Sequence, residues 1–511
     1  MNLKDIVKIQ DVLKKDMKKA LNKGKVEKTI QLIDCFADTT QRINNILRDD
    51  DVEDAIKTLS QKYIDSSGDI VNGDSNTIVM YDQIGTTACL GVQYLRGLVA
   101  CGYKIIYIFE NYNFNASIAS GLRKEVEKYC SEYYEFNSRN VYQNGKFLGN
   151  TIREIIIKAN PSKIIVHPQA TGALGMVVMH SIKGSRKFRI VPGDHHFYIG
   201  YDCFDHFIEF RPFGWSTAIY ERHIPASKIY SLSYYPIIDE FVSFQGFPEG
   251  TKGKVILASG GATYKFQGSN DFYINLESIL EKSDKAVFVF MGRPSIQLLE
   301  LSQKDNLKDK IFFLGYRKDF AAVMKNIDIL INSYPFSGGL FCQTAARFSK
   351  PILAYSPESL RVANAVEDLL GGAKNGECIT LADRNQFLQH AADMIDSEEY
   401  RKKWGAFANS IQQTEENFNS QLNDLLNENY PTLEGVDIYY VDRTIRIEQY
   451  IQIRNSGTLD YLMPISRLYK FKMFIKFYFL KSIIWKNLNF ILKNIFASIP
   501  GFRKIMTDFK V

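Results

Sequence analysis

The sequence lacks most features that would direct the chain across or into a membrane. Its first ten residues, MNLKDIVKIQ, contain no apolar core of the kind found in signal peptides. Its seven cysteines are odd in number, scattered and without a CxxC pair, which favours reduced thiols. No apolar run reaches the roughly 20 residues of a spanning helix. We therefore expect a cytoplasmic protein with free thiols.

Three kinds of ligand are also poorly supported. The net charge of +6 is modest, and no basic run interleaved with aromatics lies in the central part of the chain, which argues against nucleic acid. The turn at 83–87 has no GxGxxG pattern, which argues against a dinucleotide cofactor. Asp194, His195 and His196 are candidate metal ligands, but their spacing matches no closed zinc site. We expect neither a cofactor nor a metal.

What the sequence does contain is a repeated alternation of strands and helices. A chain of 511 residues with 45% hydrophobic content is long enough for two full domains. Apolar runs bounded by glycine turns alternate with helical spacing at 76–112, 163–236 and 254–355. Such alternation predicts parallel sheets with right-handed crossovers. The expected fold is α/β, with two Rossmann-like domains facing a cleft.

The segment 329–355, ILINSYPFSGGLFCQTAARFSKPILAY, is the most specific of these units. It predicts a short buried strand, a glycine turn, a helix and a second strand. Gly338 and Gly339 lie where that helix begins. The first-turn amides and the helix dipole favour an anion at this point, beyond the carboxyl ends of the strands.

Histidines gather in the first half of the chain. All except His390 lie between 167 and 223, which marks this region as the chemical face. Imidazole suits a general base near neutral pH. We predict His195 as that base and Asp194 as the group that orients it, with His196 as an equal competitor. The competing structural interpretation is that these histidines only cap or bond a loop.

Several of these motifs occur in the order found in one known family. The steps Thr263-Tyr264-Lys265, 313–316 (FLGY), 328–339 and Pro351 resemble the carboxy-terminal half of GT-B glycosyltransferases. The most similar pattern is that of the inverting branch with O-GlcNAc transferase and the bacterial N-glycosyltransferases. The resemblance implies that Lys265 and the glycine turn hold the donor diphosphate. The full set of expected donor-binding residues is Gly261, Thr263, Lys265, Tyr316, Arg317, Ser337, Gly338, Gly339, Leu340, Gln343 and Thr344.

The first half resembles the acceptor domain of the same family. There the resemblance rests on the Asp-His-His step, an arginine after a strand and a Tyr-Tyr-Pro end at 234–236. The residues expected on the acceptor side are Gly85, Thr86, His167 and Arg211. An ordinary strand-to-helix turn is the alternative for Gly85 and Thr86.

The implied activity is transfer of a sugar, hexosyl or N-acetylhexosaminyl, from a UDP-sugar to a lipid-linked, surface-glycan or protein acceptor. Two departures keep alternatives open. The family's hydroxyl residues after the glycine are Leu340 and Phe341 here, and its acidic residue seven positions before the proline is Thr344. They favour a catalytically silent GT-B protein that acts as a partner or chaperone subunit. A sugar-nucleotide epimerase is a weaker alternative, because it needs several cleft carboxylates.

The ends of the chain differ from its middle. We expect a helical appendage at 1–64 for a partner or for oligomerisation, an acceptor domain at 65–245, a donor domain at 246–420 and a bridging segment at 421–462. The last part, 463–511, has ten Lys and Arg residues against Asp508, with many aromatics between them. This composition predicts a basic amphipathic tail that lies on an anionic membrane surface, at the inner face of the cell membrane. Docking of the tail on a partner is the alternative.

Overall fold

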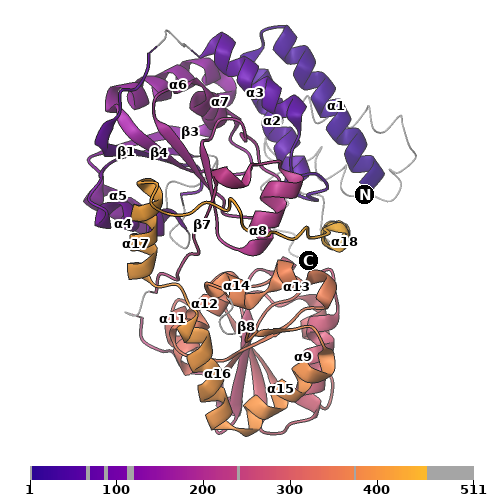
Figure 1. Ribbon diagram of the computed structural model, residues 1–511. Helices are drawn as coiled ribbons and strands as arrows, with labels where there is room; N and C mark the ends of the chain where they lie inside the picture. Colours follow the sequence, from indigo (N-terminus) through magenta and orange to yellow (C-terminus); the bar gives the residue numbers. More distant parts are fainter. Residues whose placement is uncertain are drawn as a thin grey trace, which may run out of the picture.

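The computed structural model describes residues 3–64, 69–85, 90–111, 120–238, 242–372 and 376–456. In these ranges two β-sheets, each flanked by helices, form two lobes (Figure 1). The strand order is β3-β2-β1-β4-β5-β6-β7 in the first sheet and β10-β9-β8-β11-β12-β13 in the second. In both sheets the first strand lies at an inner position, as in doubly wound folds. The predicted α/β class with two Rossmann-like units is confirmed.

The first sheet is parallel throughout, and its central strands are apolar on both faces. Residues 78–81 of the first strand are all fully buried, as expected for a sheet that helices cover on both sides. The strands are β1 (Asp74–Asp82), β2 (Lys104–Asn111), β3 (Glu132–Asn137), β4 (Pro161–His167), β5 (Arg186–Ile190), β6 (His206–Glu209) and β7 (Ile229–Ser231).

Helices from distant parts of the chain cover this sheet. One face packs against α1 (Leu3–Asn22), α2 (Val26–Gln41), α3 (Asp50–Tyr63), α6 (Ser138–Ala159) and α7 (Ala173–Ser181). The other face packs against α4 (Leu90–Ala100), α5 (Ser120–Tyr129) and α17 (Glu415–Leu426). The short α8 (Pro212–Ser216) follows β6 and continues into a π-helical turn at Thr217–Glu221.

The N-terminal helices share the core of the first lobe. The buried Asp34 of α2 accepts hydrogen bonds from the backbone amides of Gly172 and Ala173, both at 2.9 Å, where α7 begins. The buried Glu53 of α3 accepts hydrogen bonds from the amides of Gly200 and Tyr201. Buried carboxylates with backbone donors anchor these helices to the loops that follow the strands.

The second sheet repeats the same arrangement with shorter strands. They are β8 (Val255–Gly260), β9 (Ala286–Met291), β10 (Ile311–Gly315), β11 (Ile329–Ile331), β12 (Ile352–Tyr355) and β13 (Thr380–Leu381). One face packs against α9 (Asp271–Glu281), α10 (Ile296–Ser302) and α15 (Arg384–Asp396). The other packs against α11 (Phe320–Asn326), α12 (Gly339–Arg347), α14 (Val366–Leu370) and α16 (Glu398–Ser410).

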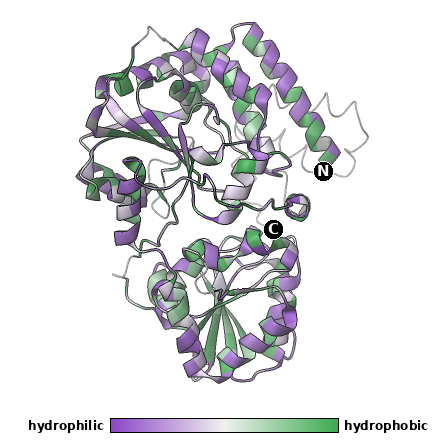
Figure 2. Cartoon of the chain, in the orientation of Figure 1, coloured by the Kyte–Doolittle hydropathy of each residue, from purple (hydrophilic) through white to green (hydrophobic). Residues whose placement is uncertain are grey.

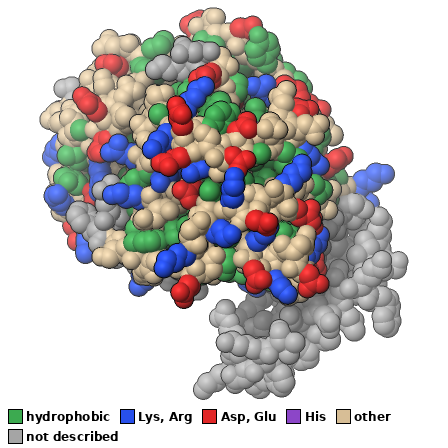
Figure 3. All heavy atoms as spheres, turned by 90° about the horizontal axis from the view of Figure 1, so that it is seen from below, with side chains coloured by type: hydrophobic (Ala, Val, Ile, Leu, Met, Phe, Trp, Pro, Cys, Tyr) green, Lys and Arg blue, Asp and Glu red, His purple; other side chains and the backbone are tan. Residues whose placement is uncertain are grey.

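The strands of this sheet are apolar along their length, whereas the helices are apolar only on the side facing it (Figure 2). At the end of the second lobe, acidic and basic side chains are interspersed on the surface (Figure 3). No helix in the described ranges has the length and apolarity needed to cross a membrane. The predicted basic tail at 463–511 lies outside the described residues.

The end of the described chain returns from the second lobe to the first. Phe418 of α17 packs edge to face on Tyr94 of α4, with ring centroids 5.2 Å apart. The final helix, α18 (Thr444–Ser456), then runs to the junction of the two lobes (Figure 1). Arg443, just before α18, donates to the carbonyl of Asn44 and pairs with Glu221 at 2.8 Å, which attaches this segment to the first lobe.

Candidate functional site

A cavity of about 300 Å³ lies between the lobes, where the carboxyl ends of both sheets meet. The first lobe contributes the end of β4 and the loops after β1, β5, β6 and β7 to its wall. The second lobe contributes the loops after β8, β11 and β12. This is the ligand position expected for parallel α/β sheets. Its lining includes His167, Asp194, His195, His196, Arg211, Tyr234, Tyr264, Lys265, Phe336, Ser337, Gly339, Leu340, Gln343, Asn364 and Arg446.

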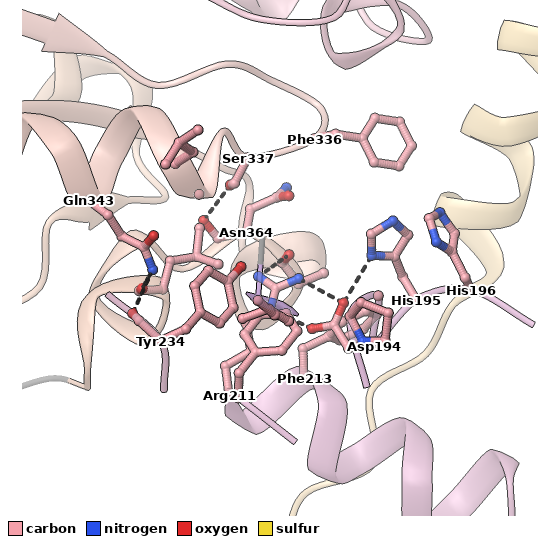
Figure 4. A pocket seen from close by; sticks show the side chains of 18 of the residues that line it. Asp194, His195, His196, Arg211, Phe213, Tyr234, Phe336, Ser337, Gln343 and Asn364 are labelled. Atoms are coloured by element: carbon pink, nitrogen blue, oxygen red, sulfur yellow. Dashed lines mark hydrogen bonds and ion pairs between the residues drawn. The ribbon is translucent and has the colours of Figure 1, made fainter. Parts of the chain in front are cut away.

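The first-lobe side of the cavity is organised by Asp194, which is fully buried. Its carboxylate accepts hydrogen bonds from Arg211 at 2.5 and 3.1 Å and contacts Nδ1 of His195 at 2.9 Å (Figure 4). Burial alone would raise the pKa of Asp194, but the Arg211 guanidinium and His195 hold it well below its usual range. Asp194 is therefore an anion that fixes two neighbouring side chains.

His195 is the member of this group that can transfer a proton. Burial lowers its pKa, against the opposing effect of Asp194, so the ring is neutral near pH 7. Because the Asp194 carboxylate only accepts hydrogen bonds, the proton of the neutral ring lies on Nδ1. No described residue bonds to Nε2, and this atom is left with a lone pair. A carboxylate that orients an imidazole whose Nε2 has no described partner is the arrangement that general-base chemistry requires.

Aromatic rings fix the direction of His195. Tyr450 of α18 stacks on its imidazole with the centroids 6.2 Å apart and the planes at 20°. Phe336 of the second lobe lies at 6.2 Å, and His196 lies at 4.0 Å. His196 lines the same cavity, while its carbonyl accepts a hydrogen bond from Arg222 at 3.0 Å. Both histidines thus lie at the cavity, and the Nδ1 atom of His195 contacts Asp194.

A second carboxylate–imidazole pair lies at the far edge of the same wall. His167 is fully buried, and its Nδ1 lies 2.9 Å from Asp82. Asp82 also accepts from the Tyr107 hydroxyl at 2.5 Å and from the amides of Ile84 and Gly85. The Nε2 atom of His167 is buried and has no partner among the described residues. His167 therefore lines the cavity with its ring held by Asp82, and its role on the acceptor side stays a prediction.

The second lobe provides cations and amides. Nζ of Lys265 donates to the carbonyl of Ser337 at 3.2 Å, and no described carboxylate lies within ion-pair distance. Burial lowers the pKa of this ammonium. Gly339 and Leu340 form the first turn of α12, which has no side-chain cap. A cation and uncapped amides meet at one point, and this geometry suits a phosphate.

Gln343 spans the two lobes. Its amide nitrogen donates to the carbonyl of Tyr234 and to that of Leu369, both at 2.9 Å, so both of its N–H groups are used (Figure 4). Its Oε1 atom is buried and has no partner among the described residues. The side chain of Gln343 thus has one buried acceptor atom without a described donor.

Other predicted donor residues lie away from the cavity wall. Arg317 pairs with Asp319 at 2.6 and 2.7 Å, and Tyr316 is 87% exposed. The hydroxyl of Thr344 donates to the Leu340 carbonyl within α12, and that of Thr263 donates to the carbonyl of residue 293. Gly85, Gly261 and Gly338 shape the neighbouring turns without lining the cavity. Thr86 lies outside the described residues.

Two cavity residues have no signal in the sequence. Asn364 lies after β12, and its side chain holds the Ser356 hydroxyl and the Arg446 guanidinium. Arg446 lies on α18, about 80 residues further along the chain, and is 3% exposed. Neither residue belongs to a recognisable motif, and only the return of the chain to the junction brings Arg446 to the cavity.

Comparisons with known proteins agree with this geometry at the level of the fold. Neither models of protein families nor curated protein sequences gave a match to this chain. Anabaena Alr3699/HepE in complex with UDP superposes with a TM-score of 0.51 and 14% identity, over 69% of this chain and 100% of HepE. HepE with UDP-glucose gives 0.50 and 14%, over 69% and 99%.

An O-GlcNAc transferase of Thermobaculum terrenum gives a TM-score of 0.48 and 11% identity, over 88% of this chain and 85% of that protein. The two facing Rossmann-like lobes, with the cavity at the ends of both sheets, are the GT-B fold. The predicted resemblance in fold is thereby confirmed.

Proposed function

We propose that this protein is a glycosyltransferase that moves a sugar from a UDP-sugar to an acceptor hydroxyl or amide, with inversion. One observation carries the proposal. The Asp194–His195 pair faces, across one cavity, Lys265 beside an uncapped helix start. In the described part of the chain, Nε2 of His195 has no hydrogen-bond partner and Lys265 has no counter-ion. A base on one side and anion-binding groups on the other are what this reaction needs.

In the proposed reaction Nε2 of His195 removes the proton from the acceptor. The acceptor atom attacks the anomeric carbon, and the bond from that carbon to the UDP oxygen breaks. Lys265 and the amides of Gly339 and Leu340 stabilise the negative charge that develops on the leaving diphosphate. Asp194 stabilises the imidazolium that forms on His195, as a carboxylate does in other acid–base pairs.

The structures of HepE with UDP and with UDP-glucose support a UDP-sugar as the donor. The Oε1 atom of Gln343, which has no described partner, supports it as well. It is a neutral acceptor for a ribose hydroxyl next to Thr344, which stands where the family has its acidic residue. For the acceptor we propose a lipid-linked or surface glycan, or a protein. A basic tail at 463–511 on an anionic membrane and a peripheral site at the inner face of the cell membrane remain part of this proposal.

A catalytically silent partner protein is the second candidate, and Leu340 and Phe341 are the features that favour it. The Phe341 ring packs on Phe320 with centroids 4.8 Å apart and does not line the cavity, so it leaves the donor side open. An epimerase fits less well, because Asp194 is the one carboxylate among the described lining residues and is already paired with Arg211.

Calorimetric titration of the full-length protein with UDP tests the proposal. We expect micromolar binding that Lys265→Met weakens about 10- to 100-fold, the range for a hydrogen bond to a charged group. Lys318→Met, which removes an exposed cation of the same lobe, serves as the control and leaves the affinity unchanged. A folded wild-type protein that does not bind UDP would reject the proposal and favour the silent partner.

A further inference from the structure

Arg446 is the most deeply buried cation at the donor side of the cavity. It projects from the first turn of α18 and donates to the carbonyl of Pro335 at 2.6 Å, to Oε1 of Gln449 at 3.1 Å and to Oδ1 of Asn364 at 2.9 Å. Its guanidinium lies 4.4 Å from the centre of the Phe336 ring. These contacts hold it against the loop between β11 and α12, next to the phosphate-binding turn proposed above.

The charge of Arg446 has no counter-ion among the described residues. All three acceptors are neutral, and no carboxylate of the described residues lies within ion-pair distance. These bonds use three of the five guanidinium N–H groups and leave two without a described acceptor. Burial lowers the pKa of Arg446 to about 10, which keeps the side chain charged at neutral pH. A buried cation with free donors is costly unless a ligand supplies the anion.

The other charges of the wall lead to the same conclusion. Arg211 is neutralised by Asp194, whereas Lys265 and Arg446 are both uncompensated. The described residues of the cavity wall therefore carry two positive charges in excess, at Lys265 and Arg446.

From this geometry we infer that Arg446 is a ligand of the donor diphosphate, and that α18 is part of the donor site. The inference rests on the proposed function for the identity of the nucleotide, but the anion site itself rests only on the contacts above. Two cations then hold the diphosphate: Lys265 from the loop after β8, and Arg446 from α18. Tyr450, one turn further along α18, stacks on His195, so the same helix contacts the base.

A purely structural role is the rival explanation, because the hydrogen bonds of Arg446 also attach α18 to the second lobe. Arg443 provides a matched control. It precedes the same helix, is 4% exposed and attaches it to the first lobe, but its charge is paired with Glu221. Loosening α18 through Arg443→Gln leaves the cations of the cavity in place.

The test is calorimetric titration of the full-length wild type, Arg446→Gln, Arg446→Lys and Arg443→Gln with three probes: UDP, uridine and inorganic pyrophosphate. We expect Arg446→Gln to lose about 10- to 100-fold in affinity for UDP and pyrophosphate, with uridine changed less than about twofold. Arg446→Lys keeps the charge and loses less. Arg443→Gln is expected to bind all three like the wild type.

The inference is overturned if Arg446→Gln binds UDP as the wild type does, or if UDP and uridine weaken equally. If Arg446→Gln does not fold, Arg446→Lys decides, since a ligand role predicts weaker pyrophosphate binding and a structural role does not. Wild-type binding of pyrophosphate without UDP would reject the proposed donor and leave the anion site standing. Binding of neither probe would reject both.

Discussion

Replacing Asp194 with asparagine removes the charge on which the first-lobe side of the cavity depends. The side chain is isosteric, so the change leaves the volume of the site intact. It takes away the ion pair with Arg211, in which two nitrogens donate at 2.5 and 3.1 Å, and the acceptor for Nδ1 of His195. Arg211 is 6% exposed and keeps one further acceptor, the carbonyl of Ala363 at 3.1 Å.

The expected magnitude follows from burial. Breaking a buried ion pair by removing one partner costs about 3–5 kcal/mol, because the remaining charge cannot return to water. An asparagine oxygen still accepts one hydrogen bond from Arg211, which places the expected loss of unfolding free energy near the lower limit, about 3 kcal/mol. The pair between Arg48 and Asp202 offers a contrast, since Asp202 is 50% exposed and lies 3.3 Å from its arginine. Asp202→Asn is expected to cost less than about 1 kcal/mol.

Urea unfolding of the three proteins, followed by circular dichroism at several pH values, measures this difference. The folded-state pKa of Asp194 is depressed, so its contribution is present above the unfolded value of about 3.9 and is lost only as pH falls through the folded value. The gap between wild type and Asp194→Asn is therefore expected to stay constant from pH 5 to 8. Equal stabilities for Asp194→Asn and Asp202→Asn would refute the reasoning that the Arg211 charge is buried and dependent on this carboxylate.

Three further predictions concern the base, a helix contact and a buried acid. His195→Gln is expected to lower the rate of sugar transfer about 10²- to 10⁴-fold, and His196→Gln far less. The rate of the wild type is expected to rise with pH through the lowered pKa of His195 and to be level by pH 7. Equal losses of rate in the two variants would contradict the assignment of His195 as the base. Gly405→Ala is expected to lower the melting temperature although alanine favours helices, because a Cβ there would lie 1.9 Å from the carbonyl oxygen of Ser349; a raised melting temperature would contradict the close packing. Burial raises the pKa of Glu209 to about 8, against the attraction of a nearby arginine, so the folded state retains a proton that the unfolded chain releases. The free energy of unfolding therefore falls as pH rises toward 8. Glu209→Gln is expected to flatten that decline in urea titrations, and an unchanged slope would exclude Glu209 as its source.

Much of the fold follows from local sequence patterns. The strands β9 and β11 are uninterrupted apolar runs, and together with β8 they lie in the segment 254–355, where the alternation of apolar runs and helical spacing predicts strands. The strand β3 (Glu132–Asn137) was missed because it is an edge strand with the polar sequence EYYEFN, half of it exposed.

Contacts of the site were predictable from the sequence only where both partners belong to one short motif. The sequence predicts Asp194 as the orienting group but leaves His195 and His196 as equal candidates for its partner, whereas the start of α12 follows from the glycine pair. The partnership of Asp194 with Arg211 spans 17 residues and depends on the loops after β5 and β6 coming together. At Arg317 the local pattern was misleading. A basic residue after a glycine turn is typical of a phosphate ligand, but the Arg317 guanidinium donates to the carboxylate of Asp319, two positions later.

Arg446 illustrates why the remainder of the site was beyond local patterns, and what would have revealed it. A lone arginine in a bridging helix has no spacing signature, and its contact with Pro335 spans 111 residues. Its proposed role follows from the net charge of the cavity wall, and that charge comes from residues that lie far apart in the sequence. Once the two lobes and their shared cleft are predicted, the chain that returns across the cleft must contact the ligand side of both sheets. Cations in that returning segment are then the first candidates for completing an anion site, provided that no carboxylate already pairs with them. Arg446 meets this condition because its described acceptors are all neutral. Arg443 does not, because it pairs with Glu221.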